Sequence, residues 1–544
     1  MSKAVRSVAL FALLSWTAIP ANLASQPANQ PSELDGQRCL GLAQLDVESG
    51  PAGPTRITSA RLLEVPSTGL VDRPNHVSGF GRRDSSASRI KKYCSVTGFV
   101  APQNKFELRL PLRADWNRKF FFVACGGFCG AVNGELCTPP LERGYATVTT
   151  NGGHDGGSGF DGLWAANAPN LQEDFAWRGA HVVTLAAKDI TQRFYDEPIL
   201  RSYMSGCSKG GQAAVMEALR FPEDYDGLMP AAPVYDYTGR SVIAAAWFAQ
   251  AVDDGRGGSV ITPAATEAVH PSVLQRCGAQ AGVDEGLVTD PLSCDWQPSM
   301  IACAPGVEND QCLSPRQVRA ITRLMTPATD SSGKVLYRYP YTPGTETEWA
   351  GWNFAALRAG RTAPEFGNFR VADQYLKYLA DATVRRSVDP LKFDFDRDPQ
   401  TLSRARSLYD ATSPDLKAFR ARGGKLLVWH GLADGGIDAA SSIGYHESVV
   451  KELGSREQAD DFFRLFLIPA VHHCGGGPGL VEFDALTALE EWVEKGRAPE
   501  KLIASRSEAG VVERSRPVYP HPLRTKYAGT GDPKAASSFV PAPR

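Results

Sequence analysis

The sequence lacks an excess of charge of either sign. Its 58 Lys and Arg residues stand against 60 Asp and Glu residues, which gives a net charge of −2. A dedicated nucleic-acid-binding protein carries a basic surplus that neutralises phosphates, so this class is excluded. A mainly disordered chain is excluded as well, because 43% of the residues are hydrophobic and only 22% are charged.

The sequence also lacks the patterns of a zinc site. None of its 11 cysteines forms a Cys-x-x-Cys pair, and the adjacent His472 and His473 lack the i, i+4 spacing that points two imidazoles at one ion. In an oxidising compartment such a set of cysteines forms disulfides instead. Because the total is odd, at least one thiol stays unpaired or bonds to another chain.

No apolar run reaches the roughly 20 residues that a membrane-spanning helix needs. The first residues have the order of an export signal, with Lys3 and Arg6, then the apolar run 8–14, then small residues at 21–25. We therefore predict that residues 1–25 are a signal peptide. The mature protein is expected to be secreted or periplasmic, with no attachment to a membrane after cleavage.

The remaining chain alternates strand and helix signals after an N-terminal extension, residues 26–90, that is rich in Pro, Gly and Ser and is expected to hold few regular elements. Predicted strands lie at 93–100, 105–112, 119–124, 144–150, 202–205, 227–232, 425–430 and 463–468, and predicted helices at 175–194 and 211–220. Alternating strands and helices predict an α/β fold, with a mostly parallel sheet covered by helices.

The sheet pattern stops between about residues 235 and 404, where cysteine loops and scattered aromatic residues replace it. We interpret residues 235–404 as one inserted lid domain and residues 26–234 with 405–544 as the catalytic domain. The tail from about Arg514 is rich in proline and is expected to pack as irregular chain.

A sharp strand-to-helix turn is predicted at Gly206-Cys207-Ser208-Lys209-Gly210. Small residues around the serine allow the strained turn that leaves its Oγ exposed, as the Gly-x-Ser-x-Gly pattern requires. Ser208 is therefore the candidate nucleophile. A serine becomes a strong nucleophile only when a histidine accepts its proton and a carboxylate orients that histidine.

Two later loops supply these partners in the expected chain order of Ser, Asp and His. The strand at 425–430 leads into Asp434, and the strand at 463–468 leads into His473. We predict that Asp434 orients His473, which acts as the base. A solvated turn aspartate and a core histidine are the alternative interpretation. Asp438, His430 and His472 are further candidates, each less well placed on its loop.

Two cysteines favour His473 over its neighbour His472. Cys207 precedes Ser208 and Cys474 follows His473, so hydrogen-bond reach between Ser208 and His473 brings the two cysteines near bridging distance. Because adjacent residues in an extended loop point in opposite directions, only one of the two histidines can face the serine. We predict a Cys207–Cys474 disulfide.

Three segments resemble the tannase and feruloyl esterase family, which includes mono(2-hydroxyethyl) terephthalate hydrolase. They are Gly-Cys-Ser-x-Gly-Gly at 206–211, His-Gly-x-x-Asp at 430–434 and Arg-Leu-Phe-x-x-Pro-x-x-x-His-Cys-x-Gly-Gly at 464–477. The resemblance covers roughly residues 39–505. It implies an α/β-hydrolase fold with a large inserted lid domain. It also implies an oxyanion hole, for which the backbone N–H groups of Lys209 and Gly127, with Gly126 as the next choice, are the candidates.

The resemblance further implies disulfides and a calcium loop. The implied disulfides are Cys39–Cys94, Cys277–Cys294 and Cys303–Cys312, which leaves Cys125, Cys129 and Cys137, of which at most two can pair with each other. Two of the expected calcium carboxylates are replaced here by Gly278 and Ala281, and the remaining candidate ligands are Glu285 and the carbonyls of Val283 and Leu287. Because a calcium ion is poorly held by so few anionic ligands, we do not expect the protein to require one.

The sequence as a whole predicts a secreted serine carboxylic-ester hydrolase that works through an acyl-enzyme. The expected substrates are small esters of aromatic acids, namely gallate, hydroxycinnamates such as ferulate, or phthalate-type monoesters, and no redox or organic cofactor is expected. Lid aromatics are expected to form a flat slot for the acid, although each one also fits a place in the lid core: Trp247, Phe248, Trp349, Trp352, Phe354, Phe366 and Phe369. An acyltransferase on the same triad and a catalytically dead secreted binding protein are the alternatives.

Overall fold

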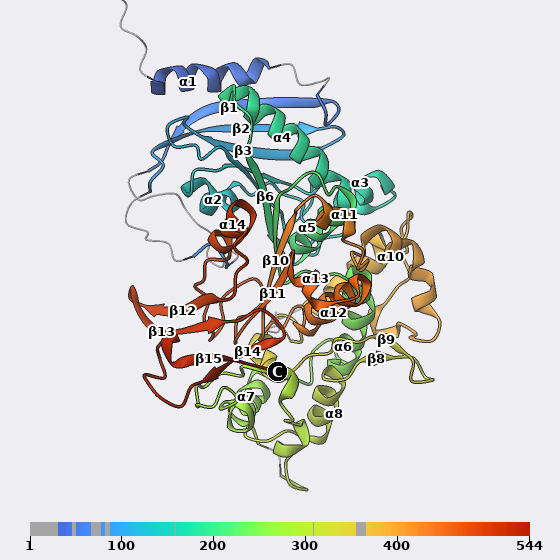
Figure 1. The fold of residues 1–544 in the computed structure, drawn as a ribbon. Helices are drawn as coiled ribbons and strands as arrows, with labels where there is room; N and C mark the ends of the chain where they lie inside the picture. Colours follow the sequence, from blue (N-terminus) through green and yellow to red (C-terminus); the bar gives the residue numbers. More distant parts are fainter. Residues whose placement is uncertain are drawn as a thin grey trace, which may run out of the picture.

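The computed structural model describes residues 31–45, 50–66, 78–81, 88–157, 159–307, 309–354 and 366–543. The predicted signal peptide lies outside these residues. Nine strands form one central sheet in the order β1-β2-β3-β5-β4-β6-β7-β10-β11 (Figure 1). Strands β1, β2 and β3 pair antiparallel with their neighbours, whereas all pairs from β5 to β11 are parallel. The predicted α/β class with a mainly parallel sheet is confirmed.

The strands of this sheet span β1 (Thr55–Glu64), β2 (Lys92–Val100), β3 (Asn104–Pro111), β4 (Lys119–Val123), β5 (Ala146–Thr150), β6 (Arg201–Cys207), β7 (Gly227–Ala231), β10 (Lys425–Gly431) and β11 (Phe463–Ile468). The residues of β4 are almost all apolar because both faces of this strand are buried. Phe120 and Phe122 pack into the hydrophobic cluster on one face of the sheet, and Phe121 and Val123 pack into the cluster on the other. A strand covered on both faces has no side left for polar residues.

Helices cover both faces of the sheet. The helices outside the predicted lid are α1 (Pro31–Gly41), α2 (Thr138–Glu142), α3 (Pro169–Glu173), α4 (Gly179–Tyr195), α5 (Lys209–Arg220), α11 (Lys417–Ala421), α12 (Ala440–Leu453), α13 (Arg456–Asp460) and α14 (Ala485–Lys495). Apolar residues of α4, α5 and α12 join the first cluster, and those of α14 join the second. Among the described residues, no helix is both long enough and apolar enough to cross a membrane.

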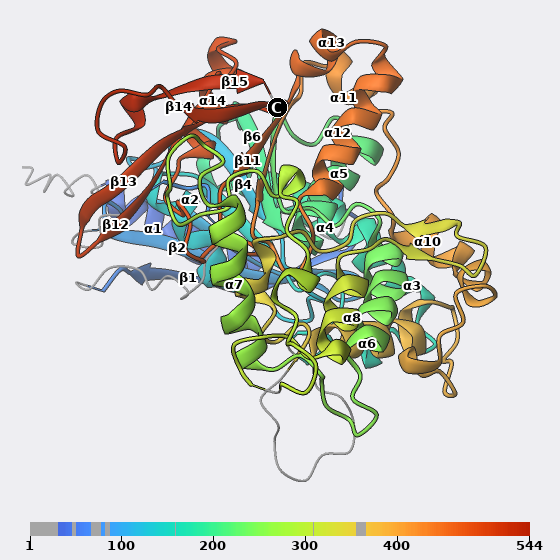
Figure 2. The same ribbon diagram turned by 90° about the horizontal axis from the view of Figure 1, so that it is seen from below.

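The segment between β7 and β10 contributes no strand to the central sheet. It contains α6 (Ala245–Val252), α7 (Pro263–Cys277), α8 (Pro315–Leu324), β8 (Ala328–Thr329), β9 (Val335–Tyr337), α9 (Gly367–Gln374) and α10 (Ser403–Tyr409). Most of its buried apolar side chains form a third hydrophobic cluster. Viewed from below, α6, α7 and α8 lie in front of the sheet (Figure 2).

The expectation of few regular elements in residues 26–90 is wrong at two places. The helix α1 and the ten-residue strand β1 both lie there, and β1 pairs along its length with β2. A β-bulge between Ile57 and Ser59 shifts the register of β1. The bulge breaks the alternation of apolar and polar residues by which a strand is recognised.

The expectation of irregular chain after Arg514 is also wrong. Strands β12 (Leu502–Glu508) and β13 (Val511–Val518) form one hairpin, and β14 (Leu523–Tyr527) pairs with β15 (Phe539–Pro543). Both are two-stranded sheets, in which a proline can occupy a position that needs no ladder N–H. The prolines of this tail therefore did not prevent strand formation.

Candidate active site

Ser208 lies at the turn between the end of β6 and the start of α5. Its backbone has φ 63° and ψ −118°, a combination that non-glycine residues rarely adopt. The two flanking glycines make this turn possible. A Cβ at Gly206 would lie 2.7 Å from the carbonyl carbon of Gly210, and a Cβ at Gly210 would lie 2.9 Å from the oxygen of Ala124. The structure thus has the strained, closely packed turn that the Gly-x-Ser-x-Gly pattern predicts.

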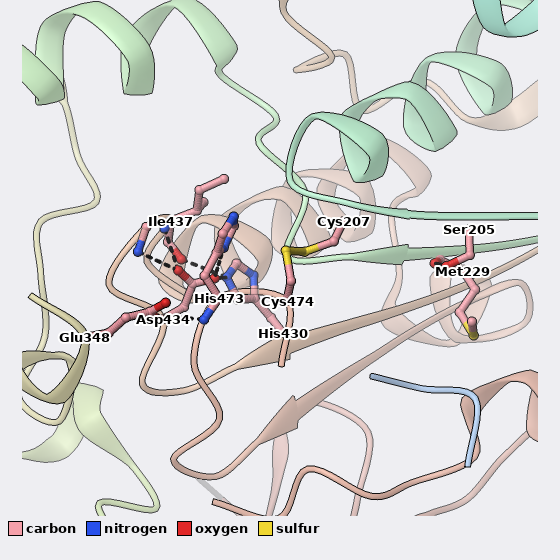
Figure 3. Close-up of a disulfide and its surroundings, with 10 residues drawn as sticks. Ser205, Cys207, Met229, Glu348, His430, Asp434, Ile437, His473 and Cys474 are labelled. Atoms are coloured by element: carbon pink, nitrogen blue, oxygen red, sulfur yellow. Dashed lines mark hydrogen bonds and ion pairs between the residues drawn. A yellow bond between two sulfur atoms is a disulfide. The ribbon is translucent and has the colours of Figure 1, made fainter. Parts of the chain in front are cut away.

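Asp434 and His473 meet at the carboxyl ends of β10 and β11 (Figure 3). His473 Nδ1 lies 2.7 Å from Asp434 Oδ2. The other carboxylate oxygen, Oδ1, accepts hydrogen bonds from the N–H groups of Gly436 at 2.8 Å and Ile437 at 2.6 Å. This arrangement fixes the imidazole with Nδ1 toward the aspartate, so Nε2 is the nitrogen that remains for a serine hydroxyl.

Burial penalises the charge of both partners, and their proximity overcomes this penalty. Burial would raise the pKa of Asp434, but His473 and the hydrogen bonds from His430 and His473 outweigh it and hold that pKa far below its ordinary value. Burial likewise opposes protonation of His473, yet the Asp434 carboxylate raises its pKa above the ordinary value. Asp434 is therefore ionised and stabilises the imidazolium that forms when His473 takes a proton.

The Cys207–Cys474 disulfide joins the serine turn to the histidine loop, with 5.7 Å between the two Cα atoms. A ring nitrogen of His473 lies within 4.8 Å of the sulfur of Cys207, the residue before Ser208. Among the hydrogen bonds of the described residues, none joins Ser208 to His473. Hydrogen bonds of this kind are often long before a substrate binds.

His472, the rival base, points elsewhere. Its Nε2 lies 2.8 Å from Thr347 Oγ1, in the segment between β7 and β10. Asp438, another candidate, accepts hydrogen bonds from the Ala440 N–H and from Thr342 Oγ1, both at 2.8 Å. Both residues thus anchor loops around the site.

Two residues that contact the Asp434–His473 pair were not assigned a role from sequence. His430, which was considered only as an alternative to His473, is fully buried with Nε2 3.1 Å from Asp434 Oδ2. Glu348 accepts hydrogen bonds from the N–H groups of Gly435 at 2.8 Å and His473 at 2.9 Å. No local motif marks Glu348, because it comes from the irregular segment before β10.

The candidate oxyanion donors lie beside the serine turn. Lys209 is the first residue of α5, so its N–H has no acceptor within the helix. Gly127 has φ +62°. The Gly126 carbonyl accepts from the Cys129 N–H, and the carbonyl of Gly127 itself accepts from the Tyr237 hydroxyl. Among the described residues, neither the Gly127 N–H nor the Lys209 N–H has an acceptor. Both remain available to a substrate oxygen.

Of the seven aromatic residues proposed as one slot, three lie in the core of the inserted segment and one lies beside His473. Phe248, Trp349 and Phe366 are at most 2% exposed and belong to the core of the inserted segment. Trp352 alone of the seven has a ring contact with His473, with the two ring centres 6.2 Å apart. Phe160, from the loop after β5, packs against Trp352 at 5.8 Å.

The cysteines form five disulfides, which leave Cys137 as a buried thiol. The pairs are Cys39–Cys94, Cys125–Cys129, Cys207–Cys474, Cys277–Cys294 and Cys303–Cys312. The Cys125–Cys129 disulfide closes the loop that contains Gly126 and Gly127. The sequence alone had not assigned a partner to either of these two cysteines. The number of disulfides is typical of proteins that fold in an oxidising compartment.

The loop between Cys277 and Cys294 does not fit a calcium ion. The Glu285 carboxylate is paired with the Arg516 guanidinium of β13, and both side chains are less than 5% exposed. Arg514 donates to the backbone oxygen of Glu285 at 2.7 Å, and Asp284 Oδ1 accepts from the Gly286 N–H at 3.0 Å. A buried arginine therefore neutralises the carboxylate that a calcium ion would need.

Sequence and structure comparisons agree on the relatives of this chain. Residues 88–542 match the family model described as tannase and feruloyl esterase. The chain belongs to the tannase and feruloyl esterase family. It is 31% identical over 523 residues to the mono(2-hydroxyethyl) terephthalate hydrolase of Piscinibacter sakaiensis, covering 84% of this chain and 86% of that protein. It is 29% identical over 441 residues to a probable feruloyl esterase B-2 of Aspergillus flavus, covering 76% and 80% of the two chains.

Two solved structures share the fold. The feruloyl esterase B of Aspergillus oryzae superimposes with a TM-score of 0.78 at 23% identity, covering 93% of this chain and 100% of that one. The tannin acyl hydrolase of Aspergillus niger gives a TM-score of 0.74 at 19% identity, covering 95% of both chains. Membership of this family makes the protein a carboxylic ester hydrolase.

The two adjacent histidines provide the first test of the site. His473→Ala should lower kcat/KM for ester hydrolysis by several orders of magnitude, because it removes the imidazole of the histidine loop that contacts Asp434. His472→Ala should keep kcat/KM within about tenfold of the unmodified protein, because its ring bonds to Thr347. The opposite result would make His472 the base.

The loop between Cys277 and Cys294 provides a second test. Arg516→Met should lower the free energy of unfolding by about 3–5 kcal/mol, because it leaves Glu285 buried without a cation. The double variant with Glu285→Met should recover most of this loss, since it replaces the pair by apolar side chains.

Chelator should leave the Tm of the unmodified protein unchanged; a clear drop in Tm would show that a metal ion holds the loop.

Proposed function

We propose that this protein is an exported serine esterase with an α/β-hydrolase fold that cleaves esters of aromatic acids. The observation that carries the proposal is the His473–Asp434 pair joined by a disulfide to the strained turn of Ser208. In this proposal residues 235–404 act as the lid domain over residues 26–234 and 405–544. The five disulfides and the signal-like N-terminus support export.

The proposed reaction has two halves. Ser208 Oγ attacks the ester carbonyl carbon while His473 Nε2 takes the hydroxyl proton, and the carbonyl oxygen becomes an oxyanion held by the N–H groups of Gly127 and Lys209. The C–O bond to the alcohol then breaks, and the alcohol leaves with the proton from His473. Water repeats the sequence on the acyl-enzyme and releases the acid. Asp434 stays ionised throughout, and neither a metal nor an organic cofactor is required.

The aromatic acid is supported by the relatives and by the rings beside His473. Relatives are named as hydrolases of terephthalate and ferulate esters. In this chain Trp352 and Phe160 form an aromatic wall beside His473. The family resemblance implies an aromatic residue three positions after the aspartate in members that hold terephthalate, and this chain has Ile437 there. We therefore favour gallate or hydroxycinnamate esters over phthalate-type monoesters.

A panel of esters tests this substrate class. Methyl or ethyl esters of gallic, ferulic and benzoic-type acids should be cleaved with kcat/KM about tenfold or more above that of acetate and butyrate esters, because one aromatic face contributes ~1–3 kcal/mol. Equal values for aromatic and short aliphatic esters would contradict the proposed class. Ser208→Ala should abolish both activities. Product analysis with added alcohol distinguishes hydrolysis from acyl transfer on the same triad.

The aromatic wall gives a sharper version of this test. Trp352→Ala should lower kcat/KM for aromatic esters about tenfold more than for acetate esters, because it removes one face beside His473. Trp247→Ala is the matched control, since Trp247 packs against Phe395 and Arg323 within the inserted segment. A change of the same size in both variants would place the acyl group elsewhere.

A further inference from the structure

One short segment of the inserted part contacts both catalytic loops. We define residues 342–348 as the strap. Thr342 at one end hydrogen-bonds Asp438, and Thr347 near the other end bonds His472. Glu348 closes the strap with its carboxylate between the loop of Asp434 and the loop of His473 (Figure 3).

A single oxygen of the Glu348 carboxylate accepts two backbone hydrogen bonds. This oxygen, Oε2, accepts the N–H of Gly435, the residue after Asp434, and the N–H of His473 itself. A Cβ at Gly435 would lie 3.0 Å from the Cβ of Glu348 and 3.1 Å from its backbone oxygen, so this close approach favours glycine. One oxygen therefore links the backbones of the acid loop and the base loop, independently of the contact between their side chains.

We propose that Glu348 is a positioning residue that holds the loops of Asp434 and His473 in register for catalysis. The proposal rests on the proposed esterase function. Without this carboxylate, the largely buried N–H groups of Gly435 and His473 would each lose their acceptor. A buried N–H group is costly to leave unpaired. The two loops would then relax, and a displacement of about 1 Å at a catalytic group can cost about a hundredfold in rate.

Glu348 also places a second negative charge near the imidazole. The charged groups that face His473 are Asp434, Glu348 and Arg240, and His430 borders Asp434 on its other side. Burial, together with the Asp434 charge, raises the pKa of Glu348 to about 7. In its ionised form Glu348 favours the protonated imidazole, so removal of its charge should lower the pKa of His473. Because the base must be neutral, the acid limb of the activity profile should then move to lower pH.

The test compares Glu348→Gln, Glu348→Ala and Glu346→Gln with the unmodified protein. Glu346 lies on the same strap, but its carboxylate accepts from the Gly344 N–H and pairs with His270, and no hydrogen bond of the described residues joins it to the loop of Asp434 or of His473, so it is the matched control. Two quantities are measured against pH: kcat/KM for the best ester, and the rate at which a fluorophosphonate labels Ser208. Thermal unfolding reports whether each variant is folded.

Glu348→Gln keeps a carbonyl acceptor and loses the charge, so both profiles should shift to lower pH. Glu348→Ala should show the same shift and a plateau about a hundredfold lower. Glu346→Gln should show neither effect. A plateau within twofold for Glu348→Ala, or profiles for Glu348→Gln that coincide with those of Glu346→Gln, would overturn the proposal.

The readouts separate this proposal from the one on which it rests. If the unmodified protein neither cleaves esters nor reacts with the fluorophosphonate, the proposed function fails. If the unmodified protein reacts and the Glu348 variants behave like the control, only the role of Glu348 fails. If Glu348→Ala does not fold, the pH shift of Glu348→Gln decides alone.

Discussion

The Cys207–Cys474 disulfide is the constraint on which the site depends. Ser208 follows β6 and His473 follows β11, and in the sheet these strands are separated by β7 and β10. With neighbouring strands about 4.8 Å apart, β6 and β11 lie roughly 14 Å from each other, well beyond hydrogen-bond reach. The two loops must therefore lean toward each other above β7 and β10. The disulfide holds them with 5.7 Å between Cα atoms, although the cysteines are 267 residues apart in the sequence.

The second condition is a set of buried charges that compensate each other. Asp434 is 1% exposed, and a lone carboxylate at that depth would take up a proton. His473, His430 and two backbone N–H groups together keep it ionised. The same principle acts at the loop closed by Cys277 and Cys294, where Arg516 neutralises Glu285. In both places one of the compensating residues is distant in the sequence, His473 by 39 residues from Asp434 and Arg516 by 231 residues from Glu285.

This distance explains what the sequence could and could not predict. The parallel sheet follows from local apolar runs such as Phe120–Val123, and the loops of Ser208, Asp434 and His473 each follow a strand that local pattern identifies. Glu348 and Arg516 carry no such pattern, because each acts on a loop built by another part of the chain. The sequence did not identify β1, because its bulge breaks the alternation, and it could not say which lid aromatics line a site, because composition does not distinguish a core ring from one that does.

The central claim is that the serine turn, the histidine loop and two backbone N–H groups converge on one substrate carbonyl. A crystal structure of the protein after reaction with a fluorophosphonate tests it most directly, since the adduct imitates the tetrahedral intermediate. We expect phosphorus bonded to Ser208 Oγ, with the phosphoryl oxygen within hydrogen-bond distance of the N–H groups of Gly127 and Lys209 and with His473 Nε2 facing the adduct. An adduct on another residue, or a phosphoryl oxygen directed away from both N–H groups, would contradict it.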